Sequence, residues 1–390
     1  MRLGRWLWPL ALLSLTACTV AEQKPEPVKP FQFRSLTLRQ NDRKGQPLWQ
    51  LRSPRARYQL NSRMASVDRP SGLLYRQGVP SYRITAPRGI VIRDGERVEL
   101  LDGVTLVSLD KRKLVIRGKK AVWIPRSDTI DLEGSPQAED GQQLITAGRA
   151  RFFTSKDLLQ LRDKPQLFQW PRNVSHRLPA RLELVTTSAD WNTGSGDLRA
   201  AGPVRSIERP GKGKQQRLLT AAAMEGNTQA EWLDFLAPVR LLDPGQQSVI
   251  DAGRSRWWYN QERITSAEPA QASLRKLKVS GRELTLMQAS NQVLVGADCV
   301  LKQPDQWLQA QRCEWNWNSG VLNAHGDVVL HRSNPEQITQ AAEMRGISGK
   351  DGAVQFSSPG NQVRTQLRFK RGQDPAGGAQ GAAARSPVQF

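Results

Sequence analysis

The chain has 390 residues, with 57 Lys and Arg against 36 Asp and Glu, so its net charge at neutral pH is +21. Hydrophobic residues make up 38% of it, which argues against both a polytopic membrane protein and a disordered chain. Three cysteines cannot build a disulfide scaffold, and three histidines argue against a multi-metal site. The positive charge predicts an anionic partner, such as a nucleic acid, a membrane surface or a phosphorylated lipid.

Residues 1–17 have the pattern of an export signal. Two arginines precede the apolar run Trp6 to Leu15, which is too short to span a bilayer. Small residues then lead to Cys18, as in a bacterial lipoprotein signal, whose cysteine is lipidated. An ordinary cleaved signal with a chance cysteine is the alternative. Export argues against a nucleic-acid partner, and the proline-containing residues 18–30 are typical of an extended tether.

The body of the chain contains a sequence repeat. The segment Ile84–Arg88 recurs with variations at Ile145–Arg149, Ile250–Arg254 and Val279–Arg282, each time before a short apolar stretch. The residue after each copy, called the anchor here, recurs about every 30 residues, which indicates a repeated structural unit. The anchors are Ala56, Gly89, Ala121, Ala150, Ala189, Met224, Ser255, Leu284, Cys313 and Met344.

Two further positions recur with the anchors. Two residues after the anchor, most units have an aromatic residue, although aromatic residues are only 6% of the chain. This column contains Tyr58, Val91, Trp123, Phe152, Trp191, Gly226, Trp257, Leu286, Trp315 and Gly346. About thirteen residues after the anchor a small or turn-forming residue recurs, at Gly103, Gly134, Asp163, Gly202, Ala237, Ala297 and Gly326.

Within a unit, apolar residues alternate with a period of two, as in Leu182–Leu184 and Trp315–Trp317, and Asp-Gly or Pro-Gly pairs mark turns. No window has the pattern of an amphipathic helix. We therefore predict an all-β fold, an elongated twisted β-jellyroll of about ten repeats of roughly 30 residues in two consecutive lobes. The units must stack because none could bury its apolar face alone.

The repeat spacing is longest around residues 171–180, where two prolines and His176 interrupt the pattern. We place a domain boundary there. The predicted organisation is a signal peptide (1–17), a tether (18–30), a first β-jellyroll (31–175), a second β-jellyroll (176–370) and a disordered tail rich in Gly and Ala (371–390).

The two sheets of such a roll would enclose a long apolar trough. Bulky side chains of the aromatic column would line the trough, and the small anchors would leave room beside them. Packing of a closed β core is the alternative for the same residues. The lining candidates are Tyr58, Val91, Trp123, Phe152, Trp191, Trp257 and Trp315. Basic residues near the rim either meet anionic head groups or form a solvated strand face; they are Arg88, Arg117, Arg149 and Arg254.

The sequence has no signature of catalysis. It lacks a Gly-x-Ser-x-Gly elbow and a phosphate-binding loop, and its histidines are scattered. We therefore predict no enzymatic activity, no catalytic residue, no metal site and no cofactor. A hairpin turn at residues 303–306 would pair Cys299 with Ala310 rather than with Cys313, which argues against a disulfide although an oxidising periplasm would permit one.

An exported chain of such repeats resembles the LptC / OstA-like family of lipopolysaccharide-transport proteins. The resemblance covers about Phe31 to Trp170 and rests on Ser53–Ala56, Ile84–Arg88 and Ile145–Ala150. It implies a V-shaped β-jellyroll that holds the acyl chains of lipopolysaccharide. Such a protein accepts lipid from the inner-membrane ABC transporter and passes it to an LptA-like bridge protein joined by edge-strand addition.

This chain departs from the family pattern in two ways. Cys18 predicts a lipid anchor where typical members have a transmembrane helix, and the repeats continue past the usual family length, from Arg181 to about Lys370. The predicted function is a non-enzymatic periplasmic lipopolysaccharide carrier, anchored in the inner membrane, with no nucleic-acid partner. A structural or adhesive envelope lipoprotein with a closed β core is the alternative.

Overall fold

A computed structural model of the protein describes residues 30–141, 143–171, 174–211, 215–347, 354–360 and 362–368. The predicted signal, Cys18, most of the tether and the predicted tail lie outside the described residues. Two short 3-10 turns, η1 (Arg93–Gly95) and η2 (Pro125–Ser127), are the described helical elements, and no described helix is long and apolar enough to cross a membrane.

The strands pair antiparallel in two facing layers, which four long strands join into one 38-stranded sheet. The long strands are β31 (Leu277–Met287), β32 (Gln292–Gln303), β35 (Val321–Ser333) and β36 (Glu336–Ile347). Layer A further contains β1 (Phe31–Phe33), β4 (Arg55–Gln59), β5 (Met64–Asp68), β8 (Arg88–Ile92), β9 (Arg97–Leu101), β12 (Lys120–Ile124), β13 (Thr129–Glu133), β16 (Arg149–Phe153), β17 (Leu158–Arg162), β20 (Ser188–Asn192), β21 (Asp197–Ala201), β24 (Ala223–Asn227), β25 (Trp232–Leu236), β28 (Ser255–Trp258), β29 (Arg263–Ser266), β34 (Arg312–Asn316) and β37 (Val354–Ser357). Layer B further contains β2 (Leu36–Asn41), β3 (Pro47–Ser53), β6 (Ser71–Arg76), β7 (Val79–Thr85), β10 (Val104–Ser108), β11 (Val115–Gly118), β14 (Gln137–Asp140), β15 (Gln143–Thr146), β18 (Gln166–Gln169), β19 (Leu182–Val185), β22 (Val204–Glu208), β23 (Arg217–Ala221), β26 (Val239–Asp243), β27 (Ser248–Ala252), β30 (Ala270–Leu274), β33 (Gln306–Ala310) and β38 (Arg364–Arg368).

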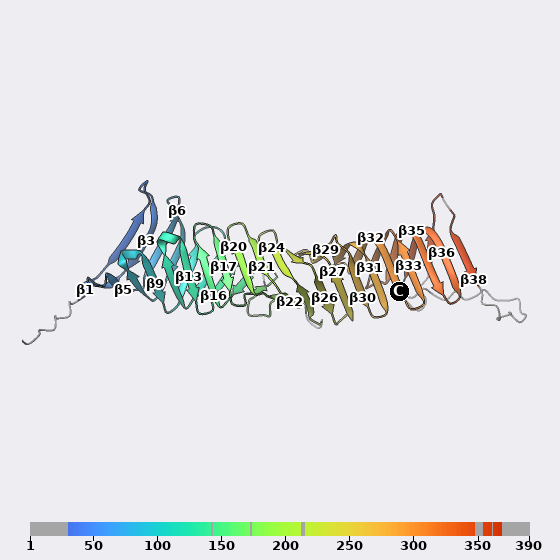
Figure 1. Ribbon diagram of the computed structural model, residues 1–390, viewed down its shortest axis with the longest axis horizontal. Helices are drawn as coiled ribbons and strands as arrows, with labels where there is room; N and C mark the ends of the chain where they lie inside the picture. Colours follow the sequence, from blue (N-terminus) through green and yellow to red (C-terminus); the bar gives the residue numbers. More distant parts are fainter. Residues whose placement is uncertain are drawn as a thin grey trace, which may run out of the picture.

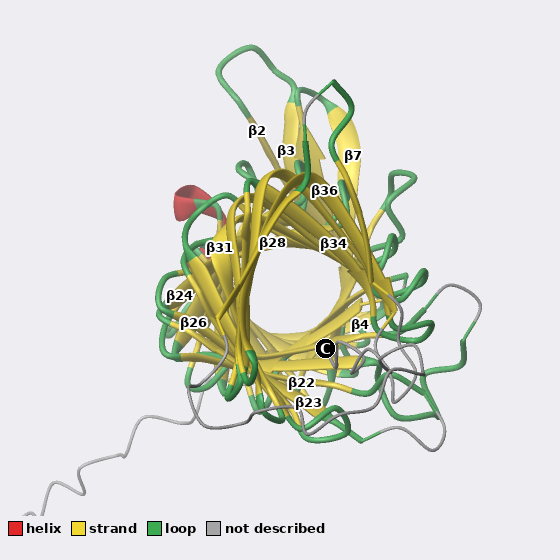
Figure 2. Ribbon diagram, turned by 90° about the vertical axis from the view of Figure 1, so that its right-hand side faces the viewer, coloured by secondary structure: helices red, strands yellow, loops and turns green. Residues whose placement is uncertain are grey.

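The strands lie side by side along an elongated molecule (Figure 1), and the two layers surround its long axis (Figure 2). Each short strand runs from a corner, where the chain changes layer, to a hairpin turn within one layer. Corners therefore follow one long side of the molecule, and two rows of hairpin turns face each other on the other side. The predicted all-β, elongated jellyroll architecture is confirmed.

The repeat in the sequence is the repeat of the structure. Ala121 pairs with Leu132, which pairs with Ala150, and Ala150 in turn pairs with Leu161. The anchors thus occupy one row across layer A, on every second strand. The recurring small residues mark the second set of corners, as Gly103 does between β9 and β10.

Glycine is required at some corners because neighbouring corners of the chain approach closely there. A Cβ atom on Gly202 would lie 1.4 Å from the carbonyl oxygen of Ala222, and one on Gly148 would lie 2.6 Å from the Cβ of Asp163. Several corners also contain proline, which ends a strand because it has no N–H to donate. The Ala-Gly and Ala-Pro pairs of the sequence motif are therefore layer-changing corners.

The buried apolar residues form two clusters. The first, called the first region here, extends from Trp49 to Tyr259, and the second region extends from Leu277 to Met344. β18 pairs with β19 across residues 171–180, so the first cluster continues through the segment where we predicted a domain boundary. The two clusters are separated between Tyr259 and Leu277, and the domain boundary at residues 171–180 stays a prediction.

Candidate functional site

The aromatic column lies on the inner face of layer A as one row. Trp123 pairs with Val98 and Ile130, and Phe152 pairs with Ile130 and Leu159. The row continues through Leu159 to Trp191, which also pairs with Leu198. The structure therefore brings all seven lining candidates onto one inward-facing row.

Most of this row is buried by its own neighbours. Val91, Trp123, Phe152, Trp191 and Trp257 are each at most 4% exposed. In the first region aromatic rings pack edge to face, with centroids 5.3 Å apart for Trp49 and Trp123.

Two of the seven lining candidates are less buried. Tyr58, at the amino-terminal end of the row, and Trp315, in the second region, are half-buried. The row is therefore most buried in the first region and more accessible at Tyr58 and at Trp315, beyond which Leu322 is buried again.

Layer B presents a matching inner row. Leu106 pairs with Ile116, Ile116 with Ala138, and Ala138 with Ile145, all of which are buried. The interior thus has an apolar surface on both sides along its length.

In the first region, polar contacts bridge the two rows of hairpin turns. Asp157, in the turn after β16 of layer A, accepts hydrogen bonds from Arg76 (2.6 and 2.9 Å) at the β6–β7 turn of layer B. The Tyr82 hydroxyl also donates to Asp157, and Arg112 Nη1 lies 3.6 Å from it. We call these four residues the Asp157 clasp.

The electrostatics of the clasp follow from its burial. Burial alone would raise the pKa of Asp157, but the hydrogen bonds from Arg76 and Tyr82 outweigh it and lower the pKa below its usual range. Burial, followed by the hydrogen bond to Asp157, raises the pKa of Tyr82 to about 12. The carboxylate therefore stays charged and the phenol stays protonated at neutral pH.

Two further contacts bridge the layers. The Gln143 amide donates to the Tyr259 hydroxyl (3.1 Å), which donates to the carbonyl of Thr228 (3.2 Å). Arg181 pairs with Glu262 at 2.9 Å. All these bridges lie between Arg76 and Glu262, so they close the hairpin side of the first region.

The inner rows become more accessible between the two clusters. We call this stretch the waist; its inward-facing residues are half-buried in both layers, namely Leu241, Ile250, Ala272 and Val279 in layer B and Ile264, Leu286 and Val293 in layer A. At its borders, the indole Nε1 atoms of Trp257 and Trp315 are buried and have no hydrogen-bond partner among the described residues.

A disulfide joins Cys299 to Cys313, with Cα atoms 6.0 Å apart, so our argument against this pairing was wrong. Cys299 does pair with Ala310 in layer B, as the turn predicts. The chain then turns a corner at Gln311, and Cys313 is the second residue of β34 in layer A, where it pairs with Val295. The cysteines face each other across the corner of two layers, which a flat hairpin cannot represent.

The rim arginines are ion-paired on the outside. Arg149 pairs with Asp163 at 2.6 Å and Arg88 pairs with Asp102, in both cases across a corner. Arg117 pairs with Glu139 and Arg254 with Asp234. Arg88 and Arg149 of the sequence motif thus pair with an aspartate at the next corner, whereas Arg254 pairs with Asp234 inside the strand β25.

The signal for the corner pair was present in the sequence. An arginine just before the anchor and an aspartate at the following corner recur as Arg55 with Asp68 and as Arg282 with Asp298. Aligning the repeats on both columns at once would have found it.

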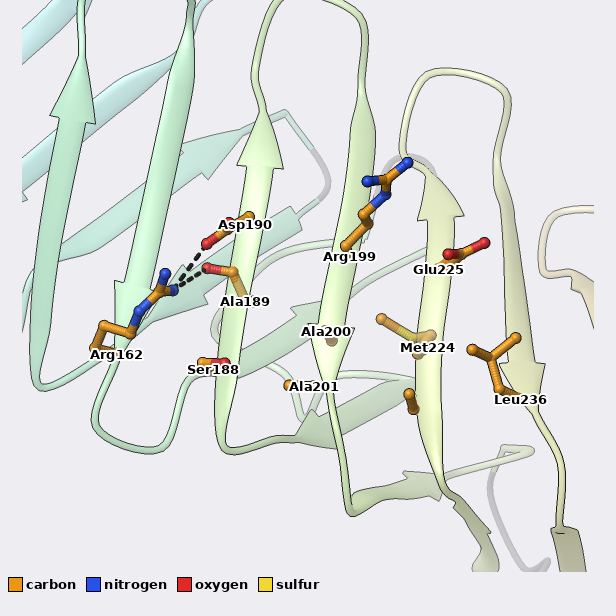
Figure 3. Close-up of a pocket in the computed structure, with 11 residues that line it drawn as sticks. Arg162, Ser188, Ala189, Asp190, Arg199, Ala200, Ala201, Met224, Glu225 and Leu236 are labelled. Atoms are coloured by element: carbon orange, nitrogen blue, oxygen red, sulfur yellow. Dashed lines mark hydrogen bonds and ion pairs between the residues drawn. The ribbon is translucent and has the colours of Figure 1, made fainter.

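A pocket of about 270 Å³ lies at β17, β20, β21 and β24, lined by the buried Ala189, Ala200 and Met224 and by charged residues that include Asp190 and Arg199. Figure 3 shows Arg162 beside Asp190 at one end of it, 2.8 Å apart. Its charged rim distinguishes this pocket from the apolar interior. Among the described residues, no three His, Cys, Asp or Glu side chains gather in a way that could hold a metal ion.

Comparison with known families adds to this geometry. Residues 8–164 match the family model of lipopolysaccharide-assembly, LptC-related proteins. No curated protein matches the chain. Members of the family act in lipopolysaccharide transport in the periplasm and at the inner membrane, with an ABC transporter and LptA. Residues 8–164 of the chain are therefore similar to the lipopolysaccharide-assembly, LptC-related family, a family of lipopolysaccharide transport.

Proposed function

We propose that the protein is a non-enzymatic carrier of lipopolysaccharide that holds acyl chains between layers A and B. The observation that carries the proposal is the pair of apolar inner rows, which are continuous along the molecule and half-buried at the waist. Covering an acyl chain stabilises it by roughly 25 cal/mol for each Å² removed from water. An apolar surface supplies this without covalent chemistry, so the lipid can leave again.

The waist is the part of the interior best suited to admit an acyl chain. In the first region the Asp157 clasp and the packed rings occupy the space between the layers, whereas at the waist Leu286, Val293 and Ile264 remain accessible. The lining assignment of Tyr58, Val91, Trp123, Phe152, Trp191, Trp257 and Trp315 is part of the same proposal, with Trp257 and Trp315 next to the waist.

The partners follow from the family and from the ends of the sheet. Lipid would arrive from the inner-membrane ABC transporter and pass to an LptA-like bridge protein. Both layers end in edge strands, β1 and β2 at one end and β37 and β38 at the other (Figure 1). Every residue of β38 is exposed, and an edge strand can pair with a strand of another protein. Acylated Cys18 would hold the chain at the inner membrane.

Site-specific photo-crosslinking in cells tests the carrier proposal. Leu286 faces inward and Thr285 faces outward on the same strand, β31, so they form a matched pair. We expect a photo-crosslinking amino acid at position 286 to capture lipopolysaccharide, and one at position 285 to capture little. Equal capture at both positions, or capture at 285 alone, would contradict the proposal.

A second candidate is a structural envelope lipoprotein with a closed core. It is favoured by the burial of Trp123, Phe152 and Trp191, which are at most 1% exposed. Depletion of the protein separates the two functions. Loss of a carrier should stop delivery of lipopolysaccharide to the cell surface, whereas loss of a scaffold should leave delivery intact.

A further inference from the structure

Exposed apolar side chains gather at the first hairpin turns of layer B. They are those of Leu48 (43% exposed), Val79 (63%) and Leu109 (39%), together with the half-buried ring of Tyr75. We call this group the tip patch. Exposed apolar groups gathered at one place usually mark a surface of interaction.

The strand register places these side chains together. Leu48 precedes Trp49, which pairs with Leu74, so Leu48 lies beside Tyr75. Tyr75 pairs with Pro80, next to Val79. The backbone N–H of Leu109 donates to the carbonyl of Ser81 on the same strand as Val79 (2.9 Å). The patch therefore crosses three successive hairpins of one layer.

These side chains are exposed at the hairpin ends of their strands. Leu48 and Tyr75 adjoin the inward-facing Trp49 and Leu74, so they face outward. Val79 lies at the tip of its hairpin, where a register shift places it on the same face as its partner Arg76, and it is 63% exposed there. Figure 2 shows the β2–β3 hairpin and the strand β7 projecting beyond the ring formed by the rest of the strands. The patch is thus a protrusion that a flat surface can reach.

Basic side chains surround the patch. Arg43 and Lys44 in the β2–β3 turn and Lys111 and Lys113 in the β10–β11 turn are exposed, and none of the four forms an ion pair with another described residue. Among the carboxylates nearby, Asp42 accepts backbone N–H groups, Asp110 pairs with Arg112, and Asp140 is half-buried. The patch therefore carries excess positive charge.

We propose that the tip patch docks on the surface of an anionic lipid bilayer. Apolar side chains that enter the head-group region, surrounded by lysines and arginines that meet anionic lipids, are the two components of peripheral membrane binding. A protein partner fits less well, because lysine is depleted at protein interfaces. The described chain also begins at this end of the molecule, with β1 (Figure 1). This contact is separate from lipid transport and from any acyl anchor.

Fluorescence of the full chain bound to vesicles tests the docking. An environment-sensitive fluorescent amino acid is placed singly at positions 48, 79 and 109, and at position 60 as a control. Leu60 is also exposed, at 52%, but lies in the β4–β5 turn of layer A at the same end. On vesicles of phosphatidylethanolamine and phosphatidylglycerol we expect a blue shift, and quenching by spin-labelled lipid, at the three tip positions and not at 60.

Charge reversal then tests the basic rim. We expect K44E/K111E/K113E to abolish the shift at position 79, while K276E/K278E/K302E, the same charge change at exposed lysines of the second region, leaves it intact. Vesicles of phosphatidylcholine alone should give no shift. An unshifted probe at 79 on anionic vesicles, or equal shifts at 60 and 79, would overturn the proposal. A shift that requires added membrane proteins would also overturn it and assign the patch to a protein partner.

Discussion

The first region, from Trp49 to Tyr259, and the second region, from Leu277 to Met344, build different interiors from the same repeat. In the first region the inner rows are buried and polar bridges such as the Asp157 clasp join the facing hairpin turns. In the second region long strands pass through both layers, a disulfide joins the layers at the corner side, and Trp315 is half-buried.

The difference shows that the repeat determines layers and rows but not whether the interior is closed. Closure depends on side chains at the hairpin turns, which lie outside the repeated columns. A roll that is fastened on its hairpin side resists entry of a ligand between its layers, whereas one fastened at its corner keeps that side free to separate. Under the carrier proposal, the waist and the second region would therefore be where lipid enters, and the first region would be a stable stalk.

The largest effect should come from deleting a ring of the first region. Trp191 is 1% exposed and makes a hydrogen bond from Nε1 to Thr228 (3.2 Å), so Trp191→Ala should lower the free energy of unfolding by about 3–5 kcal/mol. Trp315→Ala, at a half-buried position of the same row, should cost about half as much. Urea unfolding of both variants measures the difference. Equal losses would mean that the two interiors are packed alike.

The sequence predicted the parts of the fold that depend on periodicity. The alternation of apolar and polar residues identified the strands. The side chains of a strand alternate every two residues and each repeat unit contains four strands, so the anchors Ala121 and Ala150 fall in one row. The corners were recognisable since Gly148 and Gly202 permit close approach of neighbouring corners. The aromatic row followed from the same alignment.

Contacts across the interior could not be predicted. Arg76 and Asp157 are 81 residues apart, and only the offset between facing turns of a twisted roll brings them together. The Cys299–Cys313 disulfide depends on a corner between the two layers. The sequence pattern of this corner does not differ from that of a flat hairpin. A closed core and an open trough would both have the same aromatic column in the sequence. The burial of Trp123 could therefore not be deduced from that column.

Removal of the disulfide should weaken the second region selectively. The bond closes a segment with a sequence separation of 14, for which loss of loop-closure entropy in the unfolded chain corresponds to about 3 kcal/mol. In the C299A/C313A variant, hydrogen exchange of β33–β36 should accelerate while that of β12–β17 stays unchanged. The reduced wild-type protein is the control for cavity effects of the substitution. Faster exchange in both regions would show that the two cores unfold as one unit.

Loosening of the Asp157 clasp should open the first region. Asp157→Asn removes the negative charge that faces Arg76 and Arg112, and we expect a loss of about 2–3 kcal/mol, less than for a fully buried pair because Arg76 is 37% exposed. Asp163→Asn, which breaks an exposed corner pair, is the matched control. If both variants lose the same stability, the clasp is no more important than a surface ion pair.

Lowering the pH should weaken the Asp157 clasp by protonating the Asp157 carboxylate. The folded protein lowers the pKa of Asp157, so the stability it contributes is complete above the pKa of an unfolded aspartate, near 4, and is lost as the pH falls through the lower folded value. Binding of a hydrophobic dye below about pH 4 should therefore increase for the wild type and less for Asp157→Asn. An identical acid response of the two proteins would exclude the clasp as its cause.

The smallest effect should come from the corner ion pairs, which distinguish the two regions least because both contain them. Arg149 and Asp163 are 69% and 50% exposed, and Arg282 and Asp298 are 53% and 66% exposed. Water and salt screen such pairs, so Arg149→Ala and Arg282→Ala should each cost less than about 1 kcal/mol, and the cost should shrink further at high salt. Thermal unfolding at low and high salt measures this. A larger, salt-independent loss at Arg149 would mean that its corner holds the two layers together, and the closure of the first region would then begin at the corners rather than at the hairpin turns.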